Sequence, residues 1–148
     1  MNSEFDKYIS NLVANKANFP DSLFEFGTDQ KRYELNHPKS LHDSWVTSLT
    51  IAENRNRKRP FDASLSIILT LLGQQHDRDI ILTYSNVKSY ELIGHENGIN
   101  YNDTYHGDVL THEVSFENEL YKHIIELRSG SIFKVRFTEF KVNEYVYT

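Results

Sequence analysis

The chain has 148 residues, a length typical of one domain, and contains no cysteine. The missing thiols exclude a disulfide scaffold, a thiolate nucleophile and a cysteine-based zinc site. A formal net charge of −5 argues against nucleic acid as a general partner, because duplex binding depends on neutralising phosphates, and favours encounter with a basic partner.

The aromatic content favours β-structure. Phe, Tyr and Trp make up 13% of the chain, and these residues suit the half-buried surfaces of sheets. The first residues lack the basic and apolar segments of a secretion signal, and the longest apolar run, at 67–72, is too short to span a bilayer. We therefore expect a cytoplasmic protein with no membrane partner.

The beginning of the chain has helical periodicity. Ser3 is a favourable N-cap, and apolar residues follow at the 3.6-residue spacing of one helix face. These residues are Phe5, Tyr8, Ile9, Leu12 and Val13. The pattern predicts a short amphipathic helix over about 4–16. Pro20 closes this region, and residues 23–26 are compatible with a short strand.

From Trp45 onward, apolar residues alternate with a period of two, which predicts strands. The predicted strands lie at 45–51, 63–72, 78–84, 87–92, 110–116, 121–127 and 132–140. Residues 73–77 have the composition of a hairpin turn, whereas residues 94–108 have no periodicity. No helical crossover separates the strands, so we expect antiparallel pairing.

These elements predict a single α+β domain over residues 1–148. We expect one N-terminal helix packed on a mainly antiparallel, twisted sheet of about six strands, curled like a half-barrel or a sandwich. The oligomeric state stays open, although an exposed edge strand would permit pairing between copies.

Three consecutive residues, His42, Asp43 and Ser44, have the residue types of a hydrolase triad. Neighbours that enter a strand project to alternate sides, so they cannot align as nucleophile, base and orienting group. A turn or capping role is the favoured interpretation. We expect no catalytic residue here.

The seven histidines form no recognisable metal motif. His42-Asp43 and His76-Asp77 are the most suggestive pairs, but one leads into a strand and the other lies in a predicted turn. We expect His112 and His123 to face each other, or nearby groups, across a hairpin. The prediction is that the protein has no metal site and no cofactor.

The irregular segment after residue 94 is the favoured binding loop, because tyrosine is enriched at binding hot spots and carboxylates complement basic partners. The candidate residues of this loop are Tyr101, Asp103, Tyr105 and Asp108, supported by Glu117 and Glu119 from the next hairpin turn. A surface loop whose tyrosines fold onto the sheet is the alternative interpretation.

A basic run lies between two predicted strands and contains Arg55, Arg57, Lys58 and Arg59. Such a loop suits contact with phosphate, RNA backbone or an acidic protein. A solvated hairpin loop is the favoured interpretation, because the run lacks the interleaved aromatic residues that stack on single strands.

The phrase Leu41-His42-Asp43-Ser44-Trp45-Val46, followed by the predicted hairpin and Tyr84-Ser85-Asn86-Val87, resembles a group of small uncharacterised bacterial β-rich proteins. Their chains begin a strand with a Leu-His-Asp-Ser-like phrase, and some of them resemble immunity proteins, which neutralise a partner toxin. The likeness covers about residues 41–140. It implies a binding or inhibitor role and carries over no catalytic residue.

We therefore expect a non-catalytic protein-binding module, of the immunity type if the resemblance holds, that recognises a basic partner protein. The alternative is a small-molecule-binding protein or an enzyme with a pocket on the concave face of the sheet. Its polar groups would come from His112, His123 or Tyr84.

Overall fold

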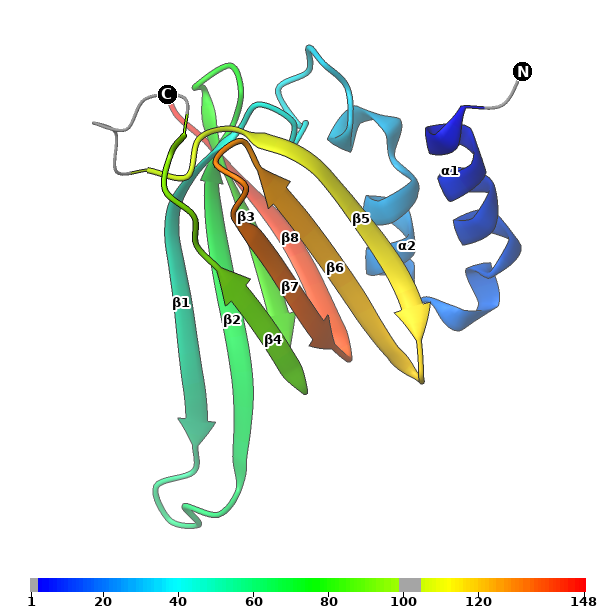
Figure 1. The fold of residues 1–148 in the computed structure, drawn as a ribbon. Helices are drawn as coiled ribbons and strands as arrows, with labels where there is room; N and C mark the ends of the chain where they lie inside the picture. The colour runs from blue at the N-terminus through cyan, green and yellow to red at the C-terminus, as the bar shows by residue number, and fades with distance from the viewer. Residues whose placement is uncertain (1–2, 99–104) are drawn as a thin grey trace.

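The computed structural model describes residues 3–98 and 105–148 (Figure 1). Helices come first within these ranges, and strands follow. The helices are α1 (Glu4–Ala14), the 3-10 helix η1 (Lys16–Asn18), α2 (Asp21–Thr28) and the 3-10 helix η2 (Gln30–Arg32). The strands are β1 (Trp45–Arg55), β2 (Ala63–Leu72), β3 (Arg78–Ser85), β4 (Ser89–Ile93), β5 (Val109–Glu117), β6 (Leu120–Leu127), β7 (Ile132–Phe137) and β8 (Glu139–Val146).

The strands form two open, four-stranded antiparallel sheets. Their strand orders are β1-β2-β3-β8 and β4-β7-β6-β5. The α+β class and the antiparallel pairing are confirmed. The number of elements is only roughly matched, since the described residues form two α-helices and eight strands where we expected one helix and about six strands.

The segment predicted as one strand over 132–140 is divided between the two sheets. Strand β7 pairs with β4 and β6, whereas β8 pairs with β3. Phe137 and Phe140 are both buried, and their spacing of three breaks the alternation of a single strand. The chain therefore crosses from one sheet to the other at Thr138, and the prediction of a continuous strand is wrong.

The interpretation of residues 23–26 as a strand is also wrong, because they lie in α2. Leu23 and Phe26 are both buried, and a spacing of three places them on one helix face. Helix α1 begins as predicted. Ser3 accepts a hydrogen bond from the backbone N–H of Asp6, whose carboxylate accepts one from the N–H of Ser3.

Buried side chains from both sheets and both α-helices form one continuous core. Tyr84 of β3 and Phe137 of β7 meet with ring centroids 5.0 Å apart, which joins the inner faces of the two sheets. The α-helices lie beside β5, β6 and β8 (Figure 1). Helix α2 is tied to β8 by the hydroxyl of Ser22, which donates to the carbonyl of Phe140. No helix among the described residues is long and apolar enough to cross a membrane.

Three cations from distant parts of the chain surround the carboxylate of Glu144 on β8. Glu144 lies 2.9 Å from the guanidinium of Arg78, 3.2 Å from that of Arg32 and 3.9 Å from the amine of Lys39. Burial acts to raise the pKa of Glu144, but the hydrogen bond from Arg78 and the three positive charges outweigh it and lower the pKa. The cluster joins η2, β3 and β8.

We predict that Glu144→Gln lowers the free energy of unfolding by about 2–3 kcal/mol at neutral pH, because two largely buried guanidinium groups lose their counter-charge. The control is Glu139→Gln, which removes an exposed carboxylate from the same strand. Urea unfolding of both variants measures the difference. Equal, small losses in the two variants would show that the cluster contributes nothing specific.

Candidate functional site

A chain of hydrogen bonds runs through the core from one sheet to the helices. The hydroxyl of Tyr84 lies 2.6 Å from Nδ1 of His123, and Nε2 of His123 lies 3.0 Å from Nδ1 of His112. Nε2 of His112 lies 3.0 Å from the carbonyl oxygen of Arg32. The chain therefore connects β3, β6, β5 and η2 in that order.

The acceptor at the end of this chain fixes the position of every proton. A carbonyl oxygen only accepts, so Nε2 of His112 carries a proton and, in the neutral ring, Nδ1 accepts. Nε2 of His123 must then donate, which leaves its Nδ1 to accept from the hydroxyl of Tyr84. Each polar atom of the three side chains in this chain has one defined partner, so the buried polar groups are satisfied.

Burial keeps both imidazoles neutral. It lowers the pKa of His112 to about 4, helped by the charge of Arg32 and opposed by the hydrogen bond to the Arg32 carbonyl. Burial, with a contribution from His112, lowers the pKa of His123 well below its usual value. Burial also raises the pKa of Tyr84. All three groups are therefore uncharged at neutral pH.

A second series of hydrogen bonds lies beside the first. The backbone N–H of Val114 donates to the hydroxyl of Tyr8 over 2.8 Å, and the hydroxyl of Tyr33 donates to the carbonyl of Gly27 over 2.7 Å. The two hydroxyls are 2.8 Å apart, so Tyr8 must be the donor in that contact. The ring of Tyr33 stacks on His112 with centroids 4.2 Å apart, which joins the two chains.

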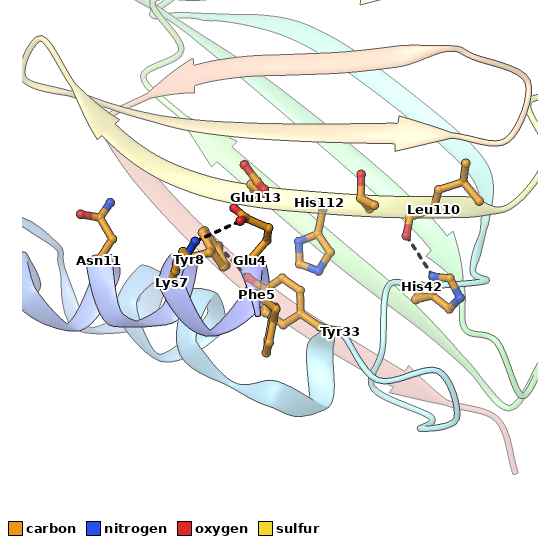
Figure 2. Close-up of a pocket in the computed structure, with 11 residues that line it drawn as sticks. Glu4, Phe5, Lys7, Tyr8, Asn11, Tyr33, His42, Leu110, His112 and Glu113 are labelled. Carbon is orange, nitrogen blue, oxygen red and sulfur yellow. Dashed lines mark hydrogen bonds and ion pairs between the residues drawn. The ribbon is translucent and has the colours of Figure 1, made fainter. Parts of the chain in front are cut away.

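These tyrosines form the inner wall of a groove of about 550 Å³ between α1 and β5 (Figure 2). Phe5, Tyr8 and Tyr33 supply aromatic rings from the helical side. The remaining lining residues are Glu4, Lys7, Asn11, His42, Leu110, Thr111, His112 and Glu113. Figure 2 shows Glu4 and Glu113 toward the same end of the groove, near Tyr8, and His42 and Leu110 toward the other end.

The charged residues that line the groove are Glu4, Lys7 and Glu113. Glu113 is exposed on β5 and forms no salt bridge with any residue that the structure describes. Burial is the largest cause that raises the pKa of Tyr8 and of Tyr33, and the charge of Glu113 raises both further. Glu4 pairs with Lys7 over 3.2 Å, but both side chains are exposed, so this pair contributes little stability.

The groove wall combines aromatic rings with polar atoms that already have partners inside the protein. The hydroxyls of Tyr8 and Tyr33 and both nitrogens of His112 are already engaged within the protein. Within 3–98 and 105–148, no three His, Asp or Glu residues converge as metal ligands. The groove presents aromatic ring faces and carboxylate oxygens to a ligand, and this combination attracts cations.

The Leu41–Trp45 phrase forms a structural corner against the start of β5. Asp43 has a φ of 62° and donates its N–H to the carbonyl of Val109, whose own N–H donates to the carbonyl of Ser44. Nδ1 of His42 donates to the carbonyl of Leu110 over 2.9 Å. The buried hydroxyl of Ser44 donates to the carbonyl of Leu41. Nε2 of His42 lies 3.4 Å from the carboxylate of Asp43, so these two side chains do approach each other, whereas the hydroxyl of Ser44 is directed to the backbone and does not join them.

Two of the predicted binding residues, Tyr101 and Asp103, lie outside the described residues. Tyr105 is exposed. Asp108 is half-buried, accepts a hydrogen bond from Nε1 of Trp45, and lies 3.5 Å from the guanidinium of Arg128. Its carboxylate therefore helps to hold the beginning of β1 in place.

Glu117 and Glu119 flank the β5–β6 turn, as expected. Glu117 pairs with Lys122 over 3.2 Å, and Glu119 has a φ of 64°. Asp108 precedes β5 and Glu117 ends it, which separates the two by about 30 Å at the rise of an extended strand. The described members of the predicted site are therefore not brought together into one patch.

The sequence interpretation missed the groove. Phe5 and Tyr8 were expected only as core-facing residues of the first helix, and Tyr33 and Glu113 were not singled out. The alternation of buried His112 and Val114 places Glu113 on the opposite face of β5, so no local pattern indicated that Glu113 and His112 line the same groove. The residues of the small-molecule alternative, His112, His123 and Tyr84, do meet, but as part of the core.

Comparison with known proteins gives no match to any family model and no match among curated proteins. The geometry of the groove therefore carries the functional argument.

We predict that stability falls as the pH is lowered from about 6.5 to about 4. The unfolded chain protonates His112 and His123 near their ordinary pKa, whereas the folded chain does so only at the lowered values, so the unfolded state binds more protons in this window. His112 alone accounts for about 3 kcal/mol across it. Denaturant unfolding at pH 7.5, 6.5 and 5.5 measures how the free energy of unfolding changes with pH above the range in which carboxylates titrate.

The control for this pH series is His76→Gln, which removes an exposed histidine and should leave the slope unchanged. A free energy of unfolding that is constant between pH 7.5 and 5.5 would contradict the neutral, buried assignment of the two imidazoles.

Proposed function

We propose that this protein is a non-catalytic protein-binding module that captures a basic segment of a partner protein in the groove between α1 and β5. An arginine or lysine side chain of the partner lies against the rings of Phe5, Tyr8 and Tyr33, and its charge faces Glu113 and Glu4. An immunity-type inhibitor that neutralises a basic toxin is the specific role that agrees with the resemblance of the sequence.

One observation carries the proposal: the groove has a carboxylate with no described counter-ion beside an aromatic wall whose own polar atoms are already satisfied. A cation over an aromatic ring contributes about 0.5–2 kcal/mol, and a charge-assisted hydrogen bond about 1.5–3 kcal/mol. A single captured side chain therefore gives millimolar affinity, and a longer basic segment strengthens it by steering and added contacts.

The wider charge distribution supports a basic partner. The chain carries a formal net charge of −5, and the exposed carboxylates of Glu4, Asp6 and Glu113 lie on the two elements that border the groove. Long-range attraction accelerates encounter between such a surface and a basic protein. The rings give the captured side chain its orientation.

A small cationic molecule is the second candidate ligand, because the groove volume of about 550 Å³ lies within the range of roughly 300–1,000 Å³ found for small-molecule sites. It would use the same rings and carboxylates. The groove lies between a helix and a sheet edge, so it differs from the concave sheet pocket that we expected for this alternative.

We predict that the capped peptide acetyl-Gly-Arg-Gly-amide binds with a dissociation constant in the millimolar range and shifts the backbone amide resonances of α1 and β5. Glu113→Gln should weaken this binding about fivefold to tenfold, because one charge-assisted contact is lost. Titrations followed by ¹H–¹⁵N correlation spectra measure both quantities. The same titration with acetyl-Gly-Gln-Gly-amide should produce no saturable shifts.

The matched control is Glu139→Gln, which removes an exposed carboxylate from β8, outside the groove lining, and changes the net charge equally. Its affinity for the arginine peptide should equal that of the natural chain. Equal weakening by both variants, or shifts that map away from α1 and β5, would reject the groove as the binding site.

A further inference from the structure

The β1–β2 hairpin forms an arm that extends beyond the ends of the other strands (Figure 1). The last fully buried residue of β2 toward the loop is Ile67, and Ile51, its partner on β1, is already exposed. The paired residues beyond them continue to Arg55 and Ala63. Leu65 still packs against the core, and its carbonyl accepts a hydrogen bond from the N–H of Val87, so the ribbon projects freely over about 7 Å before the loop begins.

The loop at the end of the arm has a defined conformation. The side-chain oxygen of Asn56 accepts hydrogen bonds from the N–H groups of Lys58 and Arg59, at 2.9 and 3.3 Å. The N–H of Asn56 donates to the carbonyl of Asp62, and the N–H of Asp62 donates to that of Arg59. These bonds hold the tip in one shape before any partner arrives.

The loop displays an apolar side chain beside unpaired cations. Phe61 is 99% exposed, the highest value among the exposed large hydrophobic residues of the described chain. The basic run at the tip has four cations, and two of them are already paired, Arg55 with Glu53 and Arg59 with Asp62. Arg57 and Lys58 are exposed and form no salt bridge with a described residue.

We propose that this tip is a second binding site, which attaches the protein peripherally to a bilayer that contains anionic lipid. Phe61 enters the boundary between headgroups and acyl chains, and Arg57 and Lys58 face the lipid phosphates and carboxylates. The inference is independent of the groove. It replaces the expectation of no membrane partner, which was based on spanning segments alone.

The arrangement of charge favours a bilayer over nucleic acid. Two unpaired cations neutralise too few phosphates for duplex binding, and a single aromatic ring offers no platform for successive bases. A bilayer needs neither a fixed spacing of phosphates nor stacking.

The test is co-sedimentation of the full chain with vesicles of 30% phosphatidylserine in phosphatidylcholine and with vesicles of pure phosphatidylcholine. We expect weak, measurable partitioning to the anionic vesicles alone, and less of it as salt rises from 50 to 300 mM. Phe61→Ser should reduce the partition coefficient about tenfold, and the double variant Arg57→Gln with Lys58→Gln should reduce it at least tenfold.

The control is the double variant Lys31→Gln with Lys141→Gln, which removes two exposed cations from other elements and should keep the partition coefficient of the natural chain. A second readout is Phe61→Trp, whose fluorescence should be quenched by lipids brominated on the acyl chain. No partitioning to anionic vesicles would overturn the proposal. So would binding to a 20-base-pair DNA duplex that depends on Arg57 and Lys58 but not on Phe61.

Discussion

The structure depends on the hydrogen-bond chain that begins at the hydroxyl of Tyr84 and ends at the backbone carbonyl of Arg32. A buried polar group without a partner costs about 1–3 kcal/mol, so three such groups in one core require a complete set of partners. The chain supplies that set only if β3, β6, β5 and η2 keep their relative positions. It therefore joins both sheets to the segment that follows the helices.

The same constraint determines what the groove can do. Tyr33 stacks on His112, and its hydroxyl is shared between Tyr8 and Gly27, so the groove wall is built from residues already engaged in the core. The side chains of the groove wall therefore present ring surface, while their hydroxyls and ring nitrogens are used in hydrogen bonds inside the protein. The carboxylates at the rim remain open to solvent, and the proposed capture of a cationic side chain depends on this contrast between rim and wall.

The fold could be predicted from the sequence where the periodicity is local. The alternation around Ile67, Leu69 and Leu71 located β2, and the N-cap Ser3 with the apolar spacing that follows it located α1. The division of the strands into two sheets was readable in principle from the spacing of Phe137 and Phe140. Helix α2 was ambiguous because Leu23–Phe26 is too short for either period to dominate.

The groove could not be predicted, because it is built by contacts between residues far apart in the chain. Tyr33 and His112 stack in the structure but lie in distant parts of the sequence, and no local pattern relates them. The Leu41–Trp45 phrase shows the opposite case: it is conspicuous in sequence, yet most of its hydrogen bonds form a corner with the backbone of Val109 and Leu110. Its side-chain contacts are those of His42 with Asp43 and of Trp45 with Asp108.

The most direct test of this account is the protonation state of the two buried imidazoles, read from long-range ¹H–¹⁵N correlation spectra at pH 7. The account requires both His112 and His123 to be neutral, with the proton on Nε2 and an unprotonated Nδ1 that accepts a hydrogen bond. A proton on Nδ1 of either ring, or an imidazolium, would contradict the hydrogen-bond chain on which the core and the groove depend.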